Sequence, residues 1–288
     1  MIMNKSQNDV ESYNMSIPDI LYKYKSWPKN VKSEFKDILT QRNLYIPSPL
    51  KFNDPFDSCI PMLATGTEEE IFDKALEIAQ KEHPRYKKES IRKVARSAIQ
   101  EKHYCNFSEQ KKILMDNLKY RYGVCSLTTK NDNLVMWSHY ADSHKGVCLG
   151  FNVRSLVNKS YFYLNKEIIL LCYSVDYYGE YPNLEFRFIL DKHNTTISLI
   201  DFKEMVKPLL SKSNHWQYEE EYRILSLNMN NYSIEYDPSE LISLYLGYRM
   251  ETEQKEEIVK LMKNKFPRTV IYQSIIKDRE FGLEFVQI

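Results

Sequence analysis

The sequence predicts an α+β fold with a mixed, largely antiparallel central sheet of about six to eight strands and two helical insertions. Short runs rich in β-branched and aromatic residues recur along the chain and end at Gly or polar residues, as strands do. Between them lie longer segments in which apolar residues recur at spacings of three and four, the periodicity of an amphipathic helix. With 288 residues, 43% of them hydrophobic, the chain can bury one large core.

We expect a single domain over residues 20–288, preceded by a flexible N-terminal lead. Residues 1–19 are polar, rich in Asn and Ser, and without apolar periodicity. Segment 19–27 alternates aromatic or aliphatic residues with lysines, which predicts the first strand. A short helical turn is expected over 35–43, and then a strand over 43–57 that runs into a loop rich in Pro and Asp.

The first helical insertion is expected at about residues 67–121, because its apolar spacing is helical and shows no alternation typical of strands. Counted together with Lys81, the block 85–121 carries twelve Lys or Arg against four Asp or Glu. Two interpretations stay open. The block is either a solvated helical surface or a surface that docks nucleic acid.

The second insertion is expected at about 181–214, where 186–192 and 197–212 are amphipathic. An amphipathic helix is predicted over 252–266, and a short helical segment within 131–143. Six further strands are predicted, the first three of them central in the sheet, at 122–128, 145–153, 168–177, 220–227, 241–250 and 269–276.

Glycine content and net charge exclude several classes of protein. Only seven glycines are present, and they form neither the G-x-G-x-x-G turn of dinucleotide-binding folds nor the G-x-x-x-x-G-K-[ST] phosphate loop. Forty basic residues against 39 acidic ones give a net charge of +1, so no global field draws the protein to nucleic acid or membranes.

The cysteines and the absence of long apolar runs indicate a cytoplasmic protein without a membrane partner. The five cysteines are odd in number and lack C-x-x-C spacing, and no N-terminal apolar segment resembles a signal peptide. We therefore expect reduced thiols. No run of apolar residues is long enough to span a bilayer.

The densest polar and aromatic segment is 131–146, which contains Trp137, His139, Tyr140 and His144. One interpretation makes Trp137 and Tyr140 core anchors with satisfied polar atoms, and His139 an ordinary histidine. The other makes the aromatics a stacking platform and His139 a hydrogen-bond donor or proton carrier. His139 and His144 are five residues apart without a third ligand at metal spacing, so we expect no metal site.

A second candidate is the segment 216–225. If it enters a strand, Glu219, Glu221 and Arg223 share one face. Charges on one face are costly to bury unless they are paired or used. The alternatives are a salt-bridge ladder on an edge strand, or an active-site face in which one Glu is an acid, a base or a ribose-hydroxyl acceptor oriented by Arg223.

A third candidate is the loop 52–57, with the sequence Phe-Asn-Asp-Pro-Phe-Asp. Asn-Asp-Pro favours a turn in which Asx side chains bond the local backbone, and the two Phe would fix the loop to the core. The structural interpretation is a turn. The functional one adds Asn53 and Asp54 to the substrate-binding residues.

Several of these segments together resemble a bacterial domain-of-unknown-function family, number 2971. The matching segments follow one another in the same order and at similar spacing, and 136–146 (MWSHYADSHKG) is the most specific. They are LYKYKS at 21–26, LYIPSPLKFNDPFD at 44–57, residues 123–151, WQYEEEYRIL at 216–225 and LYLGYRM at 244–250. Members of the family look like bacterial accessory and phage-defence (abortive infection) proteins, which implies a defence role.

The chain also bears a more distant similarity to ADP-ribosyltransferases of the DNA-modifying toxin kind. The LYKYKS strand has Lys23 where that group usually has His, and Ser243 stands where the group often has an acid. The similarity implies that NAD, as substrate, is held in a cleft between strands, with nicotinamide stacked on aromatics and a carboxylate on the ribose. The cleft would be lined by Tyr22, Lys23, Trp137, His139 and Tyr140, with Glu221 or Glu219 as the acid and Arg223 as its partner.

Three functional hypotheses follow. The first is an NAD-dependent, ADP-ribosyltransferase-like effector that modifies nucleic acid or protein. The second is a nuclease with His139 as general acid/base, Glu221 and Arg223 at the scissile phosphate, and the block 85–121 as docking surface. The third is a non-catalytic sensor of a phage component. An antitoxin or a phage protein is the expected protein partner. All three hypotheses expect Trp137, His139, Glu221 and Arg223 to converge on one cleft.

Overall fold

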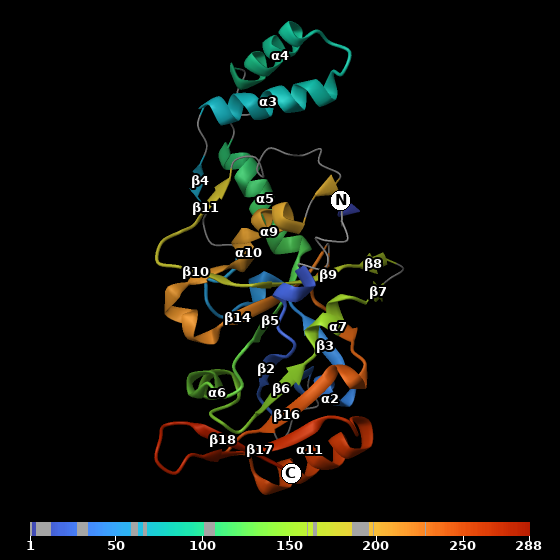
Figure 1. The fold of residues 1–288 in the computed structure, drawn as a ribbon, viewed down its shortest axis with the longest axis vertical. Coiled ribbons are helices and arrows are strands. Elements are labelled where there is room, and N and C mark those ends of the chain that lie inside the picture. The colour runs from blue at the N-terminus through green and yellow to red at the C-terminus, as the bar shows by residue number, and fades with distance from the viewer. Residues whose placement is uncertain are drawn as a thin grey trace.

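The protein is organised around one large sheet that is covered by helices on both faces (Figure 1). The computed structural model describes residues 2–3, 13–27, 34–58, 63–65, 68–100, 107–159, 161–163, 166–185, 196–197, 199–227 and 229–288. Eight strands form the central sheet in the order β18-β17-β16-β6-β2-β5-β14-β9. All neighbouring pairs are antiparallel except β16 and β17, which confirms the predicted α+β class and its largely antiparallel sheet.

The strands of the sheet coincide with the β-branched and aromatic runs of the sequence, because such side chains fit a pleated, half-buried surface. Their bounds are β2 Leu21–Lys25, β5 Gly123–Thr128, β6 Val147–Phe151, β9 Leu170–Ser174, β14 Glu221–Ser226, β16 Leu241–Leu246, β17 Val270–Ile276 and β18 Leu283–Gln287.

The two central strands β2 and β5 diverge. Strand β2 pairs with β6 at five positions, from Leu21 to Lys25, but with β5 only where Tyr22 faces Thr128. Beyond that point Lys23 bridges the strands, because its Nζ donates to the carbonyl oxygen of Ser126 at 2.9 Å. The divergence opens the middle of the sheet to side chains from other elements.

Smaller elements surround the sheet. Short ladders pair β1 (Ile2–Met3) with β12 (Thr196–Ile197), β10 (Asp176–Tyr178) with β13 (Ser211–Ser213), and β11 (Asn183–Glu185) with β4 (Leu63–Thr65). Others pair β15 (Tyr232–Glu235) with β3 (Asn43–Ile46), and β7 (Tyr161–Tyr163) with β8 (Lys166–Ile168). The 3-10 helices are η1 Pro49–Lys51, η2 Asn214–Glu219 and η3 Pro238–Glu240.

The first expected insertion contains three helices, α3 (Glu68–Glu82), α4 (Lys88–Gln100) and α5 (Phe107–Arg121). Helices α3 and α4 pack on each other through Ala75, Ala79, Ile91 and Ala95. This pair projects from the upper end of the molecule, whereas α5 lies closer to the sheet (Figure 1). Residues 66–67 and 101–106 of this insertion lie outside the described residues.

The second expected insertion is only partly helical in its described part. Its helices are α9 (Leu199–Met205) and α10 (Lys207–Leu210), and it also contains strands β11, β12 and β13. The predicted amphipathic stretch 186–192 lies outside the described residues. The other helices are α2 (Glu34–Thr40), α6 (Leu134–Tyr140), α7 (Val153–Val157) and α11 (Thr252–Lys265).

The main core lies against one face of the sheet and includes part of the expected N-terminal lead. Ile17 is fully buried in this core, and the backbone N–H of Cys172 donates to the Tyr13 hydroxyl at 2.5 Å. The described residues 13–19 therefore pack on the domain, although their polar composition suggested a frayed segment. The remainder of the lead, apart from residues 2–3, lies outside the described residues.

Strand β9 differs from its predicted place. The run 168–177 suggested a central strand, but β9 is the last strand of the sheet and pairs only with β14 within it. Its side chains Leu170, Leu171 and Cys172 are nevertheless buried, because α7 and the α9–α10 region cover this edge. A run of consecutive apolar residues indicates that both faces of a strand are buried. An edge strand that is covered by helices therefore has the same sequence pattern as a central strand.

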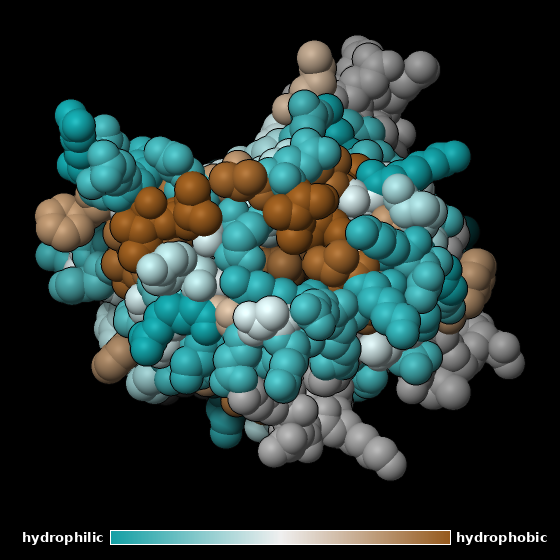
Figure 2. Space-filling model, turned by 90° about the horizontal axis from the view of Figure 1, so that it is seen from below, coloured by the Kyte–Doolittle hydropathy of each residue, from teal (hydrophilic) through white to brown (hydrophobic). Residues whose placement is uncertain are grey.

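The opposite end of the sheet exposes several apolar side chains. Figure 2 shows apolar side chains gathered on the face seen from below, the end at which β17, β18 and α11 lie. The exposed large apolar residues of this end are Ile275, Ile276, Phe281, Val286 and Ile288. Among the helices described, none combines the length and apolar content needed to cross a bilayer.

Candidate functional site

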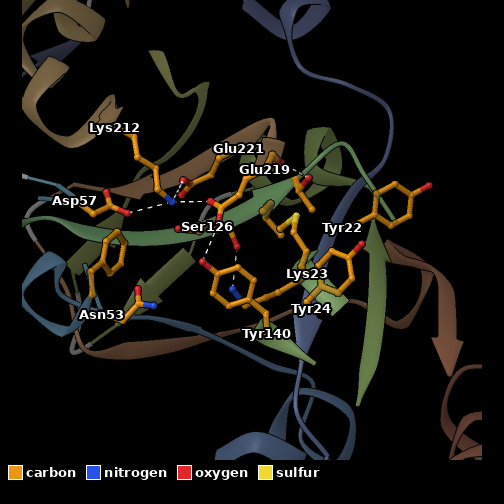
Figure 3. A pocket seen from close by; sticks show the side chains of 14 residues that line it. Tyr22, Lys23, Tyr24, Asn53, Asp57, Ser126, Tyr140, Lys212, Glu219 and Glu221 are labelled. Atoms are coloured by element: carbon orange, nitrogen blue, oxygen red, sulfur yellow. Dashed lines mark hydrogen bonds and ion pairs between the residues drawn. The ribbon is translucent and has the colours of Figure 1, made fainter. Parts of the chain in front are cut away.

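A pocket of about 140 Å³ lies where β2 and β5 diverge. Strands β2 and β5 form two of its walls, and α6, the loop 52–58 and the segment 212–221 complete it (Figure 3). The lining residues are Tyr22, Lys23, Tyr24, Phe52, Asn53, Asp57, Ser126, Leu127, Thr128, Met136, Tyr140, Lys212, Glu219 and Glu221. The wall is therefore aromatic on the β2 and α6 side and charged on the β14 side.

A buried ionic cluster forms the charged wall. Lys212 Nζ lies 2.6 Å from Glu219 Oε2, 3.0 Å from Glu221 Oε2 and 3.3 Å from Asp57 Oδ2. Figure 3 shows this ammonium group between the three carboxylates. Because all four side chains are nearly inaccessible to water, each depends on the others to satisfy its charge.

Arg223 is the second cation of the cluster and bonds both Glu221 and Asp57. It is fully buried, its Nε donates to Glu221 Oε1 at 2.8 Å, and its Nη2 donates to Asp57 Oδ1 at 2.5 Å. Its Nη1 donates to Ser58 Oγ and to the carbonyl oxygen of Leu209. Three carboxylates thus face two cations, which leaves the cluster with one excess negative charge when all five groups are ionised.

The local backbone explains why Glu219 and Glu221 point the same way while Glu220 does not. Glu219 ends η2, and Glu220 adopts a left-handed conformation with φ 42° before β14 begins at Glu221. The Thr128 hydroxyl fixes this turn by donating to the carbonyl oxygen of Glu219. Glu220 is exposed and bonds Thr129 and Lys130 on the other side. The predicted shared face of Glu219, Glu221 and Arg223 is therefore confirmed.

The face is not an edge-strand ladder, because β14 lies between β5 and β9. Charged side chains at this position cannot reach water around a sheet edge. They are instead paired inside the fold with Lys212 and Asp57, and all three carboxylates of the cluster line the pocket.

The two glutamates have opposite pKa shifts. Burial alone would raise the pKa of Glu221, but Arg223 and Lys212 outweigh it and lower that pKa to about 2. Burial also raises the pKa of Glu219, and there the effect prevails over Lys212 and the hydroxyl of Tyr140, which donates to Glu219 Oε1 at 2.7 Å. Burial lowers the pKa of Lys212, but the three carboxylates reverse this and raise it, so the ammonium stays charged.

The structure brings together seven of the ten residues that the sequence analysis singled out. Tyr22, Lys23, Asn53, Tyr140, Glu219 and Glu221 line the pocket, and Arg223 supports Glu221 from behind. They come from four segments that are far apart in sequence.

The other three predicted residues lie elsewhere, so the expected convergence of Trp137 and His139 with Glu221 and Arg223 is wrong. Trp137 is fully buried beneath the pocket wall, where its Nε1 donates to the carbonyl oxygen of Asn131 and its ring meets Tyr24 edge-on at 5.2 Å. His139 is exposed and does not line the pocket. On a helix, neighbouring positions face different directions, so α6 directs Tyr140 and His139 to different surroundings.

Asp54 has a structural role in the loop 52–58 and does not line the pocket. Its Oδ1 accepts from the backbone N–H of Phe56 at 2.8 Å, which closes the turn in the loop 52–58. Asn53, its neighbour, points into the pocket (Figure 3). The turn interpretation holds for Asp54, and Asn53 is the residue of this pair that lines the site.

Sequence analysis missed two members of the cluster, Lys212 and Asp57. Lys212 lies in β13, within a stretch interpreted as helical, and Asp57 lies beyond the Asn-Asp-Pro turn that drew attention to this loop. Charge balance in the sequence could have indicated the missing lysine. Two glutamates that share one buried face with a single arginine require a second cation. Nothing in the local sequence identifies which lysine supplies it.

The cluster is paired internally and does not form a metal site. Within the described part of the chain, no group of three or more His, Cys, Asp and Glu side chains is placed to hold a metal ion. Lys212 occupies the position between the carboxylates at which a cation would otherwise bind. The arrangement offers one carboxylate that is anionic over a wide pH range and another whose raised pKa makes it the better proton acceptor.

Comparison with known proteins gives one match. Residues 136–224 are similar to the model of a family described as protein of unknown function (DUF2971). The matched segment covers about a third of the chain and includes Tyr140, Lys212, Glu219, Glu221 and Arg223, but not the pocket residues from β2 and the loop 52–58. Neither the curated proteins nor the solved structures contain a match to the chain.

Proposed function

We propose that the pocket cleaves the N-glycosidic bond of NAD and transfers the ADP-ribose, in the manner of an ADP-ribosyltransferase. One observation carries the proposal. Two adjacent buried carboxylates with opposite pKa shifts face an aromatic wall across a small pocket. Paired carboxylates in different environments are the groups that glycoside-cleaving enzymes use.

Glu221 suits the stabilisation of positive charge. When the bond between ribose C1′ and the nicotinamide nitrogen breaks, its electron pair leaves with nicotinamide and C1′ acquires oxocarbenium character. A carboxylate that stays ionised near this carbon lowers the energy of that state, and a water-poor site strengthens the effect. Arg223 and Lys212 hold the carboxylate in place, so no reorganisation is needed during the reaction.

Glu219 suits the proton transfer that follows. The acceptor atom attacks C1′ and gives up a proton, which a carboxylate of raised pKa takes more readily than one of low pKa. Tyr140 orients Glu219 Oε1, and Lys212 orients its Oε2. The rings of Tyr22, Tyr24 and Phe52 supply a surface on which a pyridinium ring can stack.

Two features of the pocket limit what it holds. A volume of about 140 Å³ is small beside the roughly 300–1,000 Å³ of typical ligand sites, so it holds no more than the nicotinamide ring of NAD, with the ribose at its opening. Lys23 lies on the β2 wall, where it is the one cationic lining residue outside the ionic cluster among those described. We assign Lys23 to the ribose or to the phosphate next to it.

The test is release of nicotinamide from NAD by the purified protein, measured by chromatography. We expect Glu221→Gln to reduce release by about a hundredfold or more, the lower range for loss of a group that acts in the transition state. Glu220→Gln is the matched control, because Glu220 is adjacent, exposed and outside the pocket. A folded Glu221→Gln protein that releases nicotinamide like the wild type contradicts the proposal, as does a wild type that neither releases nicotinamide nor labels any acceptor in cell lysate.

Two further measurements test the other two hypotheses. The nuclease hypothesis needs His139 beside Glu221, but His139 is exposed outside the pocket, and Arg223 is too deeply buried to meet a phosphate. Intact RNA and DNA after exposure to the protein with Mg²⁺ and with EDTA would count against it. A non-catalytic sensor would keep its protective effect against phage in a folded Glu221→Gln protein, whereas the proposed transferase would lose it. The proposal includes the defence role implied by the family resemblance.

A further inference from the structure

A second pocket, of about 380 Å³, adjoins the first and shares Lys212 with it. Its lining is aromatic and open to solvent, with Phe56 59% exposed and Tyr181 47% exposed. Tyr178, Glu180 and Ser213 also line it. Large aromatic side chains are costly to leave in water, and two of them around a hollow form a surface on which a flat ring can stack.

The loop 52–58 separates the two pockets and holds Phe56 in place. Phe52, Asn53 and Asp57 face the first pocket, whereas Phe56 faces the second. The Asp54 carboxylate accepts from the N–H of Phe56, and Asp57 is tied to Arg223, so the loop is fixed on both sides of Phe56. On the other wall, β10 pairs with β13 in a register that sets Tyr177 beside Lys212 and Tyr178 beside Ser213.

The second pocket lies next to the ladder that leads into the helical hairpin α3–α4. Tyr181 is followed by β11, which pairs with β4, and β4 leads into α3 and α4 (Figure 1). Residues 84–97 of the hairpin contain six basic side chains and one acidic one, all exposed. They are Arg85, Lys87, Lys88, Arg92, Lys93 and Arg96, with Glu89. These side chains give α4 and the turn before it a basic face that suits a polyanion, whereas α3 carries six acidic side chains and two basic ones.

The remainder of NAD is a poorer occupant of the second pocket. To reach from one pocket to the other, a dinucleotide would have to lay its pyrophosphate over Asp57, Glu219 and Glu221, with Lys212 already neutralised by them. The cluster has an excess negative charge, so phosphate groups there would be repelled. A neutral ring that enters the second pocket from outside meets no such barrier.

We infer that the second pocket binds a base of a single-stranded nucleic acid, stacked on Phe56 and Tyr181, as the acceptor of the transferred group. The inference rests on the proposed function for the role of acceptor, but not for binding itself. In the transfer, the C1′–nicotinamide bond breaks, a bond forms between C1′ and a nitrogen or oxygen of the base, and the proton of that atom passes to Glu219. Stacking on aromatic side chains is how proteins hold unpaired bases.

The experiment measures binding of short fluorescein-labelled single-stranded DNA and RNA of mixed sequence by fluorescence anisotropy. We expect Phe56→Ala and Tyr181→Ala each to weaken binding about tenfold, because stacking of one base contributes roughly 1–3 kcal/mol. Tyr248→Ala is the control, since Tyr248 is 46% exposed but belongs to the loop after β16, outside both pockets. The DNA and RNA arms show which sugar the site prefers.

Several outcomes would overturn the inference. Wild-type protein that binds neither probe, or variants at Phe56 and Tyr181 that bind like the wild type, would exclude a base in this pocket. If the two variants raise KM for NAD while oligonucleotide binding is unchanged, the pocket holds part of the dinucleotide instead. If the wild type binds oligonucleotides through Phe56 but releases no nicotinamide, the proposed function fails and the base-binding pocket stands.

Discussion

Arg223 shows how one residue can be essential to the fold and to the site together. It donates five hydrogen bonds to Asp57, Ser58, Leu209 and Glu221 from a fully buried position. A buried ion pair adds little net stability, but the removal of one partner is costly because the other charges are left uncompensated. Its role is therefore to position Glu221.

The first prediction concerns this residue. We expect Arg223→Met to lower the free energy of unfolding by about 3–5 kcal/mol, because Asp57 and Glu221 would lose their main partner. Urea denaturation followed by circular dichroism measures the change. Arg42→Met is the control, since Arg42 pairs with Glu235 at the surface and its removal should cost less than about 1 kcal/mol. Equal losses in the two variants would contradict the assignment.

The second prediction follows from the low pKa of Glu221. A carboxyl whose pKa falls from 4.5 to about 2 on folding stabilises the protein above its unfolded pKa, and this contribution is lost as pH falls toward 2. Between neutral pH and pH 3 the loss amounts to roughly 2 kcal/mol.

The measurement is the unfolding free energy of the wild type and of Glu221→Gln across this range. The wild type should lose the additional stability on acidification, and the variant, which starts less stable, should not. Glu220→Gln serves again as the control with an exposed carboxyl. Parallel pH profiles for the wild type and Glu221→Gln would contradict the low pKa.

At the scale of elements, helix α6 joins the aromatic wall to the ionic cluster. Asn133 caps the helix by accepting from the N–H groups of Val135 and Met136, and its Nδ2 donates to the carbonyl oxygen of Tyr218. Tyr140 at the far end of α6 donates to Glu219. The cap therefore fixes the helix to the segment that supplies both glutamates.

The third prediction compares two helix caps of the same residue type. Asn133→Ala and Asn152→Ala each remove an N-cap, from α6 and α7, and each should cost about 1 kcal/mol of stability. Only Asn133→Ala should also reduce nicotinamide release, because α7 lies away from the pocket. Thermal unfolding and the release assay measure the two effects, and a similar loss of activity in both variants would show that the effect is general destabilisation.

The elements also show where sequence reasoning succeeds and where it fails. Most strands of the central sheet follow from local composition, and α6 and α11 from periodicity, since burial on one or both faces leaves a pattern in the sequence. Strand β18 at the edge of the sheet was not predicted. The position of β9 at the edge and the split between β2 and β5 depend on which segments pair, and the sequence of a strand does not encode its neighbours. Segment 211–213 was assigned to a helix because its apolar neighbours obscured a three-residue strand.

At the scale of the whole molecule, charge is unevenly distributed although the net charge is only +1. Helix α4 and the turn before it carry an exposed basic surface, while the pocket wall carries an excess of negative charge. The hairpin packs through its own small apolar cluster, so changes on its exposed face should leave the central sheet intact.

The fourth prediction tests the basic surface independently of the pocket. The double variant Arg92→Ala, Lys93→Ala should weaken binding of single-stranded oligonucleotide and reduce the slope of log affinity against log salt by about 1.4, or roughly 0.7 for each phosphate that a basic side chain no longer neutralises. Nicotinamide release from NAD should be unchanged, because the pocket is remote from α4. Anisotropy titrations at several salt concentrations measure the slope. An unchanged slope would show that the basic face of α4 does not bind phosphate.

The sequence by itself determined the α+β class and most strands of the sheet, because both depend on local periodicity. It also predicted the shared face of Glu219, Glu221 and Arg223, although a left-handed turn at Glu220, and not strand alternation, places Glu219 on that face. It also identified Tyr22, Lys23, Asn53 and Tyr140 as candidates. Only the tertiary structure decided that Lys212 and Asp57 complete the cluster, that Trp137 and His139 lie outside the pocket, and that a second aromatic pocket adjoins it. These features join segments up to about 170 residues apart, and such contacts are set by how the strands pair and pack around the sheet, which no local pattern records.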